Sequence, residues 1–178
     1  MQKNRIYDAL RCIFAGLFLA LAATSANAGD FSDLQKAAKG QTVYFNAWGG
    51  DAKINSYISW TGQTLADRHD ITLVHVKLTD TASAVSRILA EKAAGRENGG
   101  LIDLLWVNGE NFAAMKRAGL LQDRSWVTSL PNWRYTDSEA LPAILSDFAE
   151  PTNSKESPWG RAQLVFSYDS ARLKTPPK

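Results

Sequence analysis

Cysteine occurs once in the 178 residues, as Cys12, and histidine occurs only twice, as His69 and His75. A single thiol excludes an internal disulfide and a zinc–thiolate site, and the two histidines match no metal-ligand spacing. The sequence also contains no G-x-S-x-G elbow, no H-E-x-x-H and no glycine-rich loop ending in Lys-Ser/Thr. These absences argue against an enzyme with a familiar catalytic motif, and we expect no cofactor and no metal.

An excess of one charge is absent as well. The chain has 20 Lys and Arg against 18 Asp and Glu, and without residues 1–28 it has 17 of each, since Lys3, Arg5, Arg11 and Asp8 are removed. Binding to nucleic acid relies on clustered basic side chains. We therefore expect no nucleic-acid partner.

Residues 1–28 have the features of a signal peptide. A positively charged start precedes an apolar run, Ile13 to Ala23, and Ala26-Asn27-Ala28 places small residues where a signal peptidase cleaves. The apolar run is shorter than the roughly 18 residues that a membrane-spanning helix needs. We expect export to the periplasm with cleavage after Ala28, and no lipid anchor, because Cys12 precedes the apolar run.

Strands and helices alternate after the leader. The first strand is predicted over Thr42 to Trp48, and Asp51 is the expected N-cap of the helix that follows Gly49-Gly50. Such alternation is typical of βαβ units and a mainly parallel sheet, so the predicted fold class is α/β. Three further features are predicted: strands over Ile71 to Leu78, Leu101 to Val107 and Ala162 to Asp169, an irregular segment over 122–157, and one helical turn around Ala140 to Leu145.

The predicted strands end in small or hydrogen-bonding residues. These ends are Trp48-Gly49-Gly50, Thr79-Asp80-Thr81 and Asn108-Gly109-Glu110-Asn111, and each of them opens a helix. Ligands of open α/β sheets bind outside the carboxyl ends of the strands. Unpaired N–H groups at helix N-termini suit polar oxygens, so the amides at Gly49-Gly50 and Gly109 are expected donors to a ligand.

Each of these residues also has a purely structural interpretation. The glycine pair can be a tight turn, and Asp80 and Glu110 can cap helices rather than meet a cationic ligand. Trp48 and Trp159, which flank glycines, are the indoles favoured as ligand contacts. Gly49-Gly50 is not part of a G-x-G-x-x-G motif, and Asp51 brings a negative charge beside it. Both features argue against a nucleotide phosphate at this position.

Several longer blocks carry a resemblance to a known family. They are "NAWGGD", "HVKLTDTASAVSRILAEKAAGR", "DLLWVNGENFAAMKRAGLL", "LPNWRY" and "SPWGRAQLVFSYDSARL". In these blocks the chain resembles the extracytoplasmic solute-binding proteins of ATP-binding-cassette importers, and in particular their YnjB-type branch. The resemblance implies a periplasmic-binding-protein fold of type II, with two α/β lobes that close on a solute, and no enzymatic activity. It maps one wall of the cleft onto Trp48, Gly49, Gly50, Asp80, Asn108, Gly109, Glu110 and Asn111, with Trp159 and Gly160 near the hinge.

The resemblance also implies partners and domain boundaries. The partners are a small solute and an inner-membrane permease with its ATPase, and the protein itself is expected to be a monomer. Since members of the family are about twice as long, residues 29–161 are expected to form an incomplete first lobe and 162–178 the start of the crossover. With the second lobe absent, we expect that the chain does not close on a solute.

The function and the solute stay open at this point. A periplasmic enzyme on a similar scaffold and a nonfunctional remnant are the alternative functions. The indoles and acids suit a cationic or aromatic solute, helix N-termini suit an anion equally well, and a metal chelate is a third option.

Overall fold

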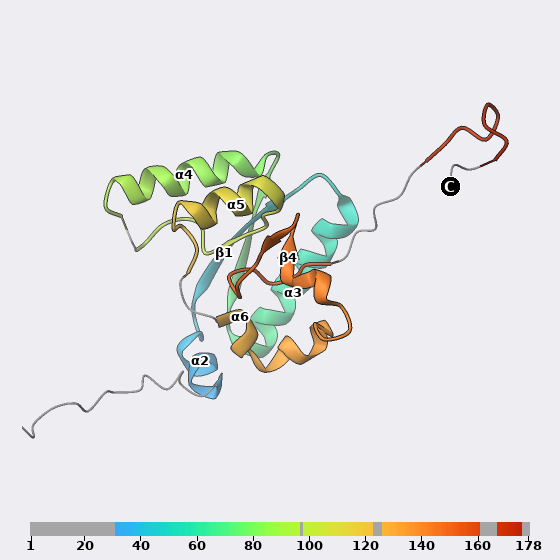
Figure 1. Ribbon diagram of the computed structural model, residues 1–178. Coiled ribbons are helices and arrows are strands. Elements are labelled where there is room, and N and C mark those ends of the chain that lie inside the picture. Colours follow the sequence, from blue (N-terminus) through green and yellow to red (C-terminus); the bar gives the residue numbers. More distant parts are fainter. Residues whose placement is uncertain (1–30, 97, 123–125, 161–166, 176–178) are drawn as a thin grey trace, which may run out of the picture.

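A three-stranded parallel sheet flanked by helices forms a single lobe (Figure 1). The computed structural model describes residues 31–96, 98–122, 126–160 and 167–175. The predicted α/β class is confirmed. In chain order the elements are α2 (Phe31–Ala37), β1 (Thr42–Trp48), α3 (Ala52–His69), β2 (Thr72–Leu78), α4 (Thr81–Ala93), β3 (Leu104–Leu105), α5 (Gly109–Arg117), α6 (Trp126–Ser129), the 3-10 helices η1 (Pro131–Thr136) and η2 (Pro142–Leu145), β4 (Ser146–Asp147) and β5 (Glu150–Pro151).

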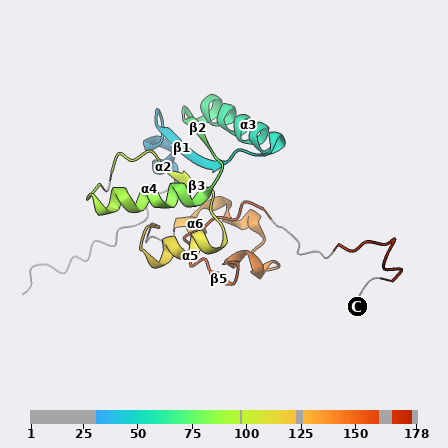
Figure 2. The same cartoon turned by 90° about the horizontal axis from the view of Figure 1, so that it is seen from above.

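The order of the strands in the main sheet is β2-β1-β3. β1 pairs with β2 in parallel from Thr42↔Thr72 to Trp48↔Leu78, and with β3 at Phe45↔Leu104. The chain thus leaves β1 in one direction and crosses back over it to reach β3. Because parallel crossovers are right-handed, α3 and α4 lie on opposite faces of the sheet, as Figure 2 shows.

Helix α3 begins where the sequence predicts. The carboxylate of Asp51 accepts a hydrogen bond of 2.9 Å from the backbone N–H of Ile54, which makes it the N-cap. The helix ends at His69, and its C-cap Asp70 adopts a left-handed conformation with φ 56°. β1 has the predicted boundaries, whereas β2 begins one residue later than predicted, at Thr72.

The third strand differs from its prediction in length and in burial. Only Leu104–Leu105 forms a regular strand, and Leu101 and Leu104 are 54% and 44% exposed, so this segment is not covered on both faces. Side chains replace part of the ladder next to it: Asp103 accepts from the Tyr44 amide at 2.8 Å, and Asn46 donates to the Leu101 carbonyl at 3.1 Å. The apolar run predicted a longer strand because such side-chain pairing is not visible in hydropathy.

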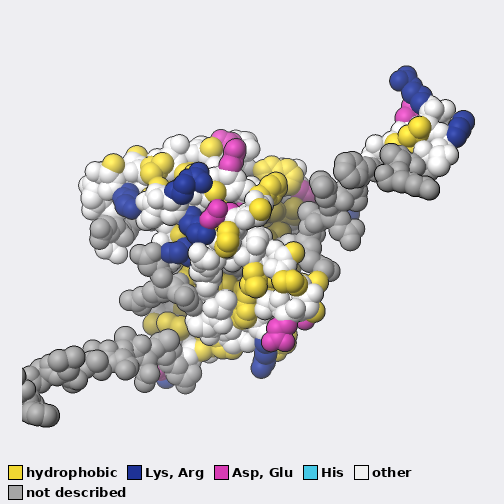
Figure 3. All heavy atoms as spheres, in the orientation of Figure 1, with side chains coloured by type: hydrophobic (Ala, Val, Ile, Leu, Met, Phe, Trp, Pro, Cys, Tyr) yellow, Lys and Arg dark blue, Asp and Glu magenta, His cyan; other side chains and the backbone are white. Residues whose placement is uncertain are grey.

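The buried core of the described residues is small. It consists of Ala47, Ile58, Ala84, Val85, Phe112, Met115 and Val127. Phe112 and Met115 are buried on α5, whereas Tyr57 on α3 and Leu89 on α4 are 54% and 44% exposed. Many other large apolar side chains are exposed too, and Figure 3 shows hydrophobic side chains spread over the visible face of the molecule.

The segment after residue 122 is more ordered than predicted. Besides η2, which overlaps the expected helical turn, it contains α6, η1 and an antiparallel hairpin of β4 and β5. The two residues of the hairpin turn, Phe148 and Ala149, both have positive φ angles (45° and 68°). Of the strand predicted over 162–169, residues 162–166 lie outside the described ranges, and residues 167–169 have no regular structure.

Candidate functional site

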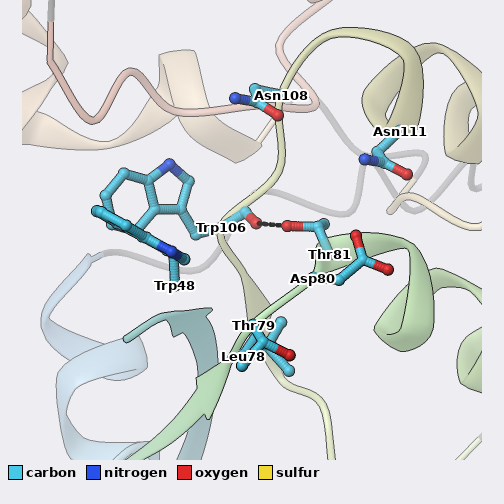
Figure 4. Close-up of a pocket in the computed structure, with 8 residues that line it drawn as sticks. All are labelled: Trp48, Leu78, Thr79, Asp80, Thr81, Trp106, Asn108 and Asn111. Carbon is cyan, nitrogen blue, oxygen red and sulfur yellow. Dashed lines mark hydrogen bonds between the residues drawn. The ribbon is translucent and has the colours of Figure 1, made fainter. Parts of the chain in front are cut away.

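A pocket of about 310 Å³ lies at the carboxyl ends of the three parallel strands. Figure 4 shows the eight residues that line it, and they come from the ends of the strands, the loops that follow them and the first turns of α4 and α5. β2 and β3 lie on opposite sides of β1, so the strand order reverses here, and open α/β sheets bind ligands at such a switch point. The lining residues are Trp48, Leu78, Thr79, Asp80, Thr81, Trp106, Asn108 and Asn111.

Two indoles form one side of this pocket. Figure 4 shows Trp48 and Trp106 next to each other, with Asp80, Thr81 and Asn111 on the opposite side. Trp48 is 45% exposed at the end of β1. Trp106 stacks on Trp159, with ring centroids 4.8 Å apart and an interplanar angle of 29°. The pocket therefore offers an aromatic wall and a polar wall that face each other.

The position of the Trp48 indole explains the second glycine of the pair. A Cβ atom at Gly50 would overlap the Trp48 ring, so only glycine allows the indole to lie across the backbone at this point. At Gly49 the aliphatic part of Lys77 lies close to the same backbone. The atoms that approach this glycine pair are side chains of the protein itself.

Replacing Gly50 by alanine is therefore expected to move the Trp48 indole out of its position. The pocket would lose part of its aromatic wall, while α3, whose N-cap is Asp51, would still form. A shift in the tryptophan fluorescence maximum with an unchanged far-ultraviolet circular dichroism spectrum would show this. The control is Ala52→Gly at the start of α3, which changes the local backbone and should leave the fluorescence maximum in place. A Gly50→Ala protein with the original fluorescence spectrum would contradict the assigned ring position.

The polar wall is built mainly from the starts of two helices. Asp80 is the N-cap of α4, with its carboxylate accepting from the Ala82 amide at 3.2 Å. The Thr81 hydroxyl lies 3.5 Å from the Trp106 carbonyl, which ties the loop after β2 to the loop after β3. Asn108 precedes α5 without a side-chain capping bond, so its amide is not used in that way.

Two backbone amides that were expected to donate to a ligand have partners inside the protein. The Gly49 amide donates to the Leu78 carbonyl at 3.0 Å, which continues the pairing of β1 and β2. The Gly109 amide donates to the Asp147 carboxylate at 2.5 Å. These two amides are therefore already paired within the protein, and the expectation that the loops bind a solute stays a prediction. The sequence did not indicate either partner.

The β4–β5 hairpin clamps α5 at both ends. Asp147 binds the amide at the start of the helix, and the Lys116 ammonium near its end donates to the Glu150 carboxylate at 2.6 Å and to the Pro151 carbonyl. Burial raises the pKa of Glu156 from 4.5 to about 7, and the negative charge of Asp147 adds to this effect. Because these hydrogen bonds hold both ends of α5, the hairpin fixes the orientation of the helix that carries Asn111 into the pocket. Asp147 and Gly109 are 38 positions apart in the sequence.

The structure does not bring all predicted site residues to the pocket. Trp48, Asp80, Asn108 and Asn111 line it, whereas Gly49, Gly50, Gly109 and Glu110 belong to the same loops without lining it, and Gly160 lies outside it. Trp159 does not line the pocket, but its ring stacks on that of Trp106 and also contacts the rings of Tyr57 and Phe45. Trp106 was not singled out by sequence reasoning, although its place at the end of the third strand matches that of Trp48 at the end of the first.

Two further features are absent from the described ranges. No three His, Cys, Asp or Glu side chains come together there in a way that could hold a metal ion. None of the helices in those ranges is long and apolar enough to cross a membrane.

Comparison with known proteins gives one clear relationship. No family model matches the chain. No solved structure matches it either. Protein YnjB of Escherichia coli (strain K12) is 51% identical over 148 residues, which cover 83% of this chain and 37% of that protein. The chain is therefore a homologue of Protein YnjB that spans little more than a third of that protein's length.

Proposed function

We propose that the chain is part of a periplasmic solute-binding component of an ATP-binding-cassette importer. In this role the pocket at the sheet edge contributes one wall of the solute site, and the loaded protein delivers its solute to a membrane permease. No bond is made or broken. The family resemblance of the sequence supports the role, and the homology to Protein YnjB is consistent with it.

The convergence of three loops on one pocket is the observation that carries this proposal. Loops after β1, β2 and β3, which are up to about 60 residues apart in the sequence, all contribute lining side chains. The lining combines indoles with hydroxyl, amide and carboxylate groups, which is the mixture of apolar surface and few polar groups found in small-molecule sites. The parallel sheet alone would bring the three loops to one edge, and it is the mixed lining of the pocket that suits this edge to a small molecule.

A binding screen with a tryptophan variant tests the proposal. Purified protein is titrated with a panel of small polar solutes of both charges by isothermal titration calorimetry. Since this pocket supplies one wall of the site and closure is not expected, at least one solute should bind weakly, with a dissociation constant of about 1 mM. We expect Trp48→Ala to weaken that binding about tenfold, because loss of a ring contact costs about 1–1.5 kcal/mol.

Trp60→Ala is the matched control for this experiment. Trp60 is an indole on α3 that is 62% exposed and does not line the pocket, so its removal is expected to leave the affinity unchanged. Equal effects of the two substitutions, or a panel in which nothing binds, would refute a solute site at this pocket.

A further inference from the structure

The helices at the rim of the pocket share one feature, which is a carboxylate at each N-terminus. Asp51 accepts from the Ile54 amide of α3 at 2.9 Å, and Asp80 accepts from the Ala82 amide of α4 at 3.2 Å. At α5 the carboxylate comes from the β4–β5 hairpin, as Asp147 accepts from the Gly109 amide. The partial positive charges of the three helix ends are thus already opposed by negative side chains.

This arrangement decides between an anionic and a cationic solute. Anions bind at helix N-termini because free N–H groups and a positive dipole end are offered there. Here a carboxylate of the protein already accepts from one N–H group at the start of each of the three helices. An anion in the pocket would therefore meet the negative charge of Asp80 at short range, and one N–H group at each of the three helix ends is already taken.

The residues that line the pocket also carry a net negative charge. Asp80 is the one formally charged residue among the eight that line it, and no Lys or Arg is among them. In the part of the chain that the structure describes, no ion pair involves Asp80. Lys77, whose aliphatic part lies against Gly49, is a basic side chain beside the rim, but it does not line the pocket.

The indole wall completes a site for a cation. Figure 4 shows Trp48 and Trp106 on one side of the pocket and Asp80 on the other. Indole faces attract ammonium groups through the ring quadrupole, and a carboxylate across the pocket adds direct charge attraction. The side-chain oxygens of Asn108 and Asn111 can accept hydrogen bonds from a hydroxyl group, or an N–H group, of such a cation.

We propose that this pocket selects a small organic cation, with an ammonium group held between the indoles of Trp48 and Trp106 and the carboxylate of Asp80. This proposal rests on the proposed function, which leaves the charge of the solute open. It specifies that charge and names the residues that set it.

Choline and two compounds of nearly the same shape test the charge preference. In 3,3-dimethylbutanol a carbon atom replaces the charged nitrogen of choline, and 3,3-dimethylbutyrate carries a negative charge instead. We expect the protein to bind choline at least tenfold more tightly than the alcohol at low ionic strength, and the carboxylate most weakly. A carboxylate that binds as well as choline, or an alcohol that does, would overturn the proposal.

Asp80→Asn separates the charge of this residue from its capping role. Asparagine is as good an N-cap as aspartate, so α4 is expected to form in the variant. Its affinity for choline should fall about tenfold, while its affinity for 3,3-dimethylbutanol should not change. An unchanged affinity for choline would contradict the assigned role of Asp80.

Asp51→Asn is the matched control, since Asp51 caps the neighbouring helix α3 but does not line the pocket. We expect it to bind choline like the original protein. The two proposals fail in different ways. If solutes bind in a Trp48-dependent manner but are anions, only the cation preference falls; if no solute depends on Trp48, the solute site itself is refuted.

Discussion

Replacing Phe112 by alanine is expected to lower the free energy of unfolding by about 3–5 kcal/mol. Phe112 is 0% exposed on α5 and is among the largest fully buried side chains of the described residues. The core around it is small, so few neighbouring side chains can move in to fill the cavity. Denaturant unfolding followed by circular dichroism measures the loss as a lower transition midpoint.

Phe148→Ala removes the same side chain at a site without burial. Phe148 is 84% exposed in the turn between β4 and β5, so its replacement is expected to change the free energy of unfolding by less than about 0.5 kcal/mol. Similar decreases in the free energy of unfolding of the two variants would contradict the stabilising role of the buried Phe112 side chain.

The second large effect is a loss of stability as the pH rises. The pKa of Glu156 is raised from 4.5 to about 7 by burial and by the charge of Asp147. Between these values the folded chain holds a proton that the unfolded chain has released, so the free energy of unfolding falls as the pH rises from about 4.5 to 7 and levels off above that range. Because Glu156 is only partly buried, we expect a fall of about 1–2 kcal/mol.

Glu156→Gln should remove this fall, because glutamine stays neutral at every pH. The variant is expected to be more stable than the original protein at pH 8 and equally stable at pH 4, as measured by denaturant midpoints across this range. Glu139→Gln changes an exposed carboxylate and should leave the original pH profile in place. A Glu156→Gln protein that still loses stability from pH 5 to 7 would show that another group is responsible.

The part of the fold that could be predicted is the part that local signals encode. β1 shows its boundaries because a run of strand formers stops at a glycine pair, and α3 shows its start because Asp51 stands at the N-cap position. The third strand was predicted too long, since the side-chain bonds of Asp103 and Asn46 that replace its ladder depend on residues more than 50 positions apart.

The candidate site was predictable to a similar extent. Parallel strands bring their carboxyl ends to one edge, so Trp48, Asp80 and Asn108 could be expected near each other from the βα alternation alone. The bond from the Gly109 amide to Asp147 could not be expected, because a short hairpin within an irregular segment has no hydropathy signal. That bond is also what removes one of the donors the sequence indicated for a ligand.

The capping bond of Asp80 has a consequence for how this protein can evolve. One side chain both starts a helix and sets the charge of the pocket, so most substitutions there would alter foldability and ligand preference together. Asparagine is the exception, and it is one nucleotide away from aspartate in the genetic code. A lineage could therefore change the charge preference of this pocket by a single point mutation without rebuilding the helix beneath it.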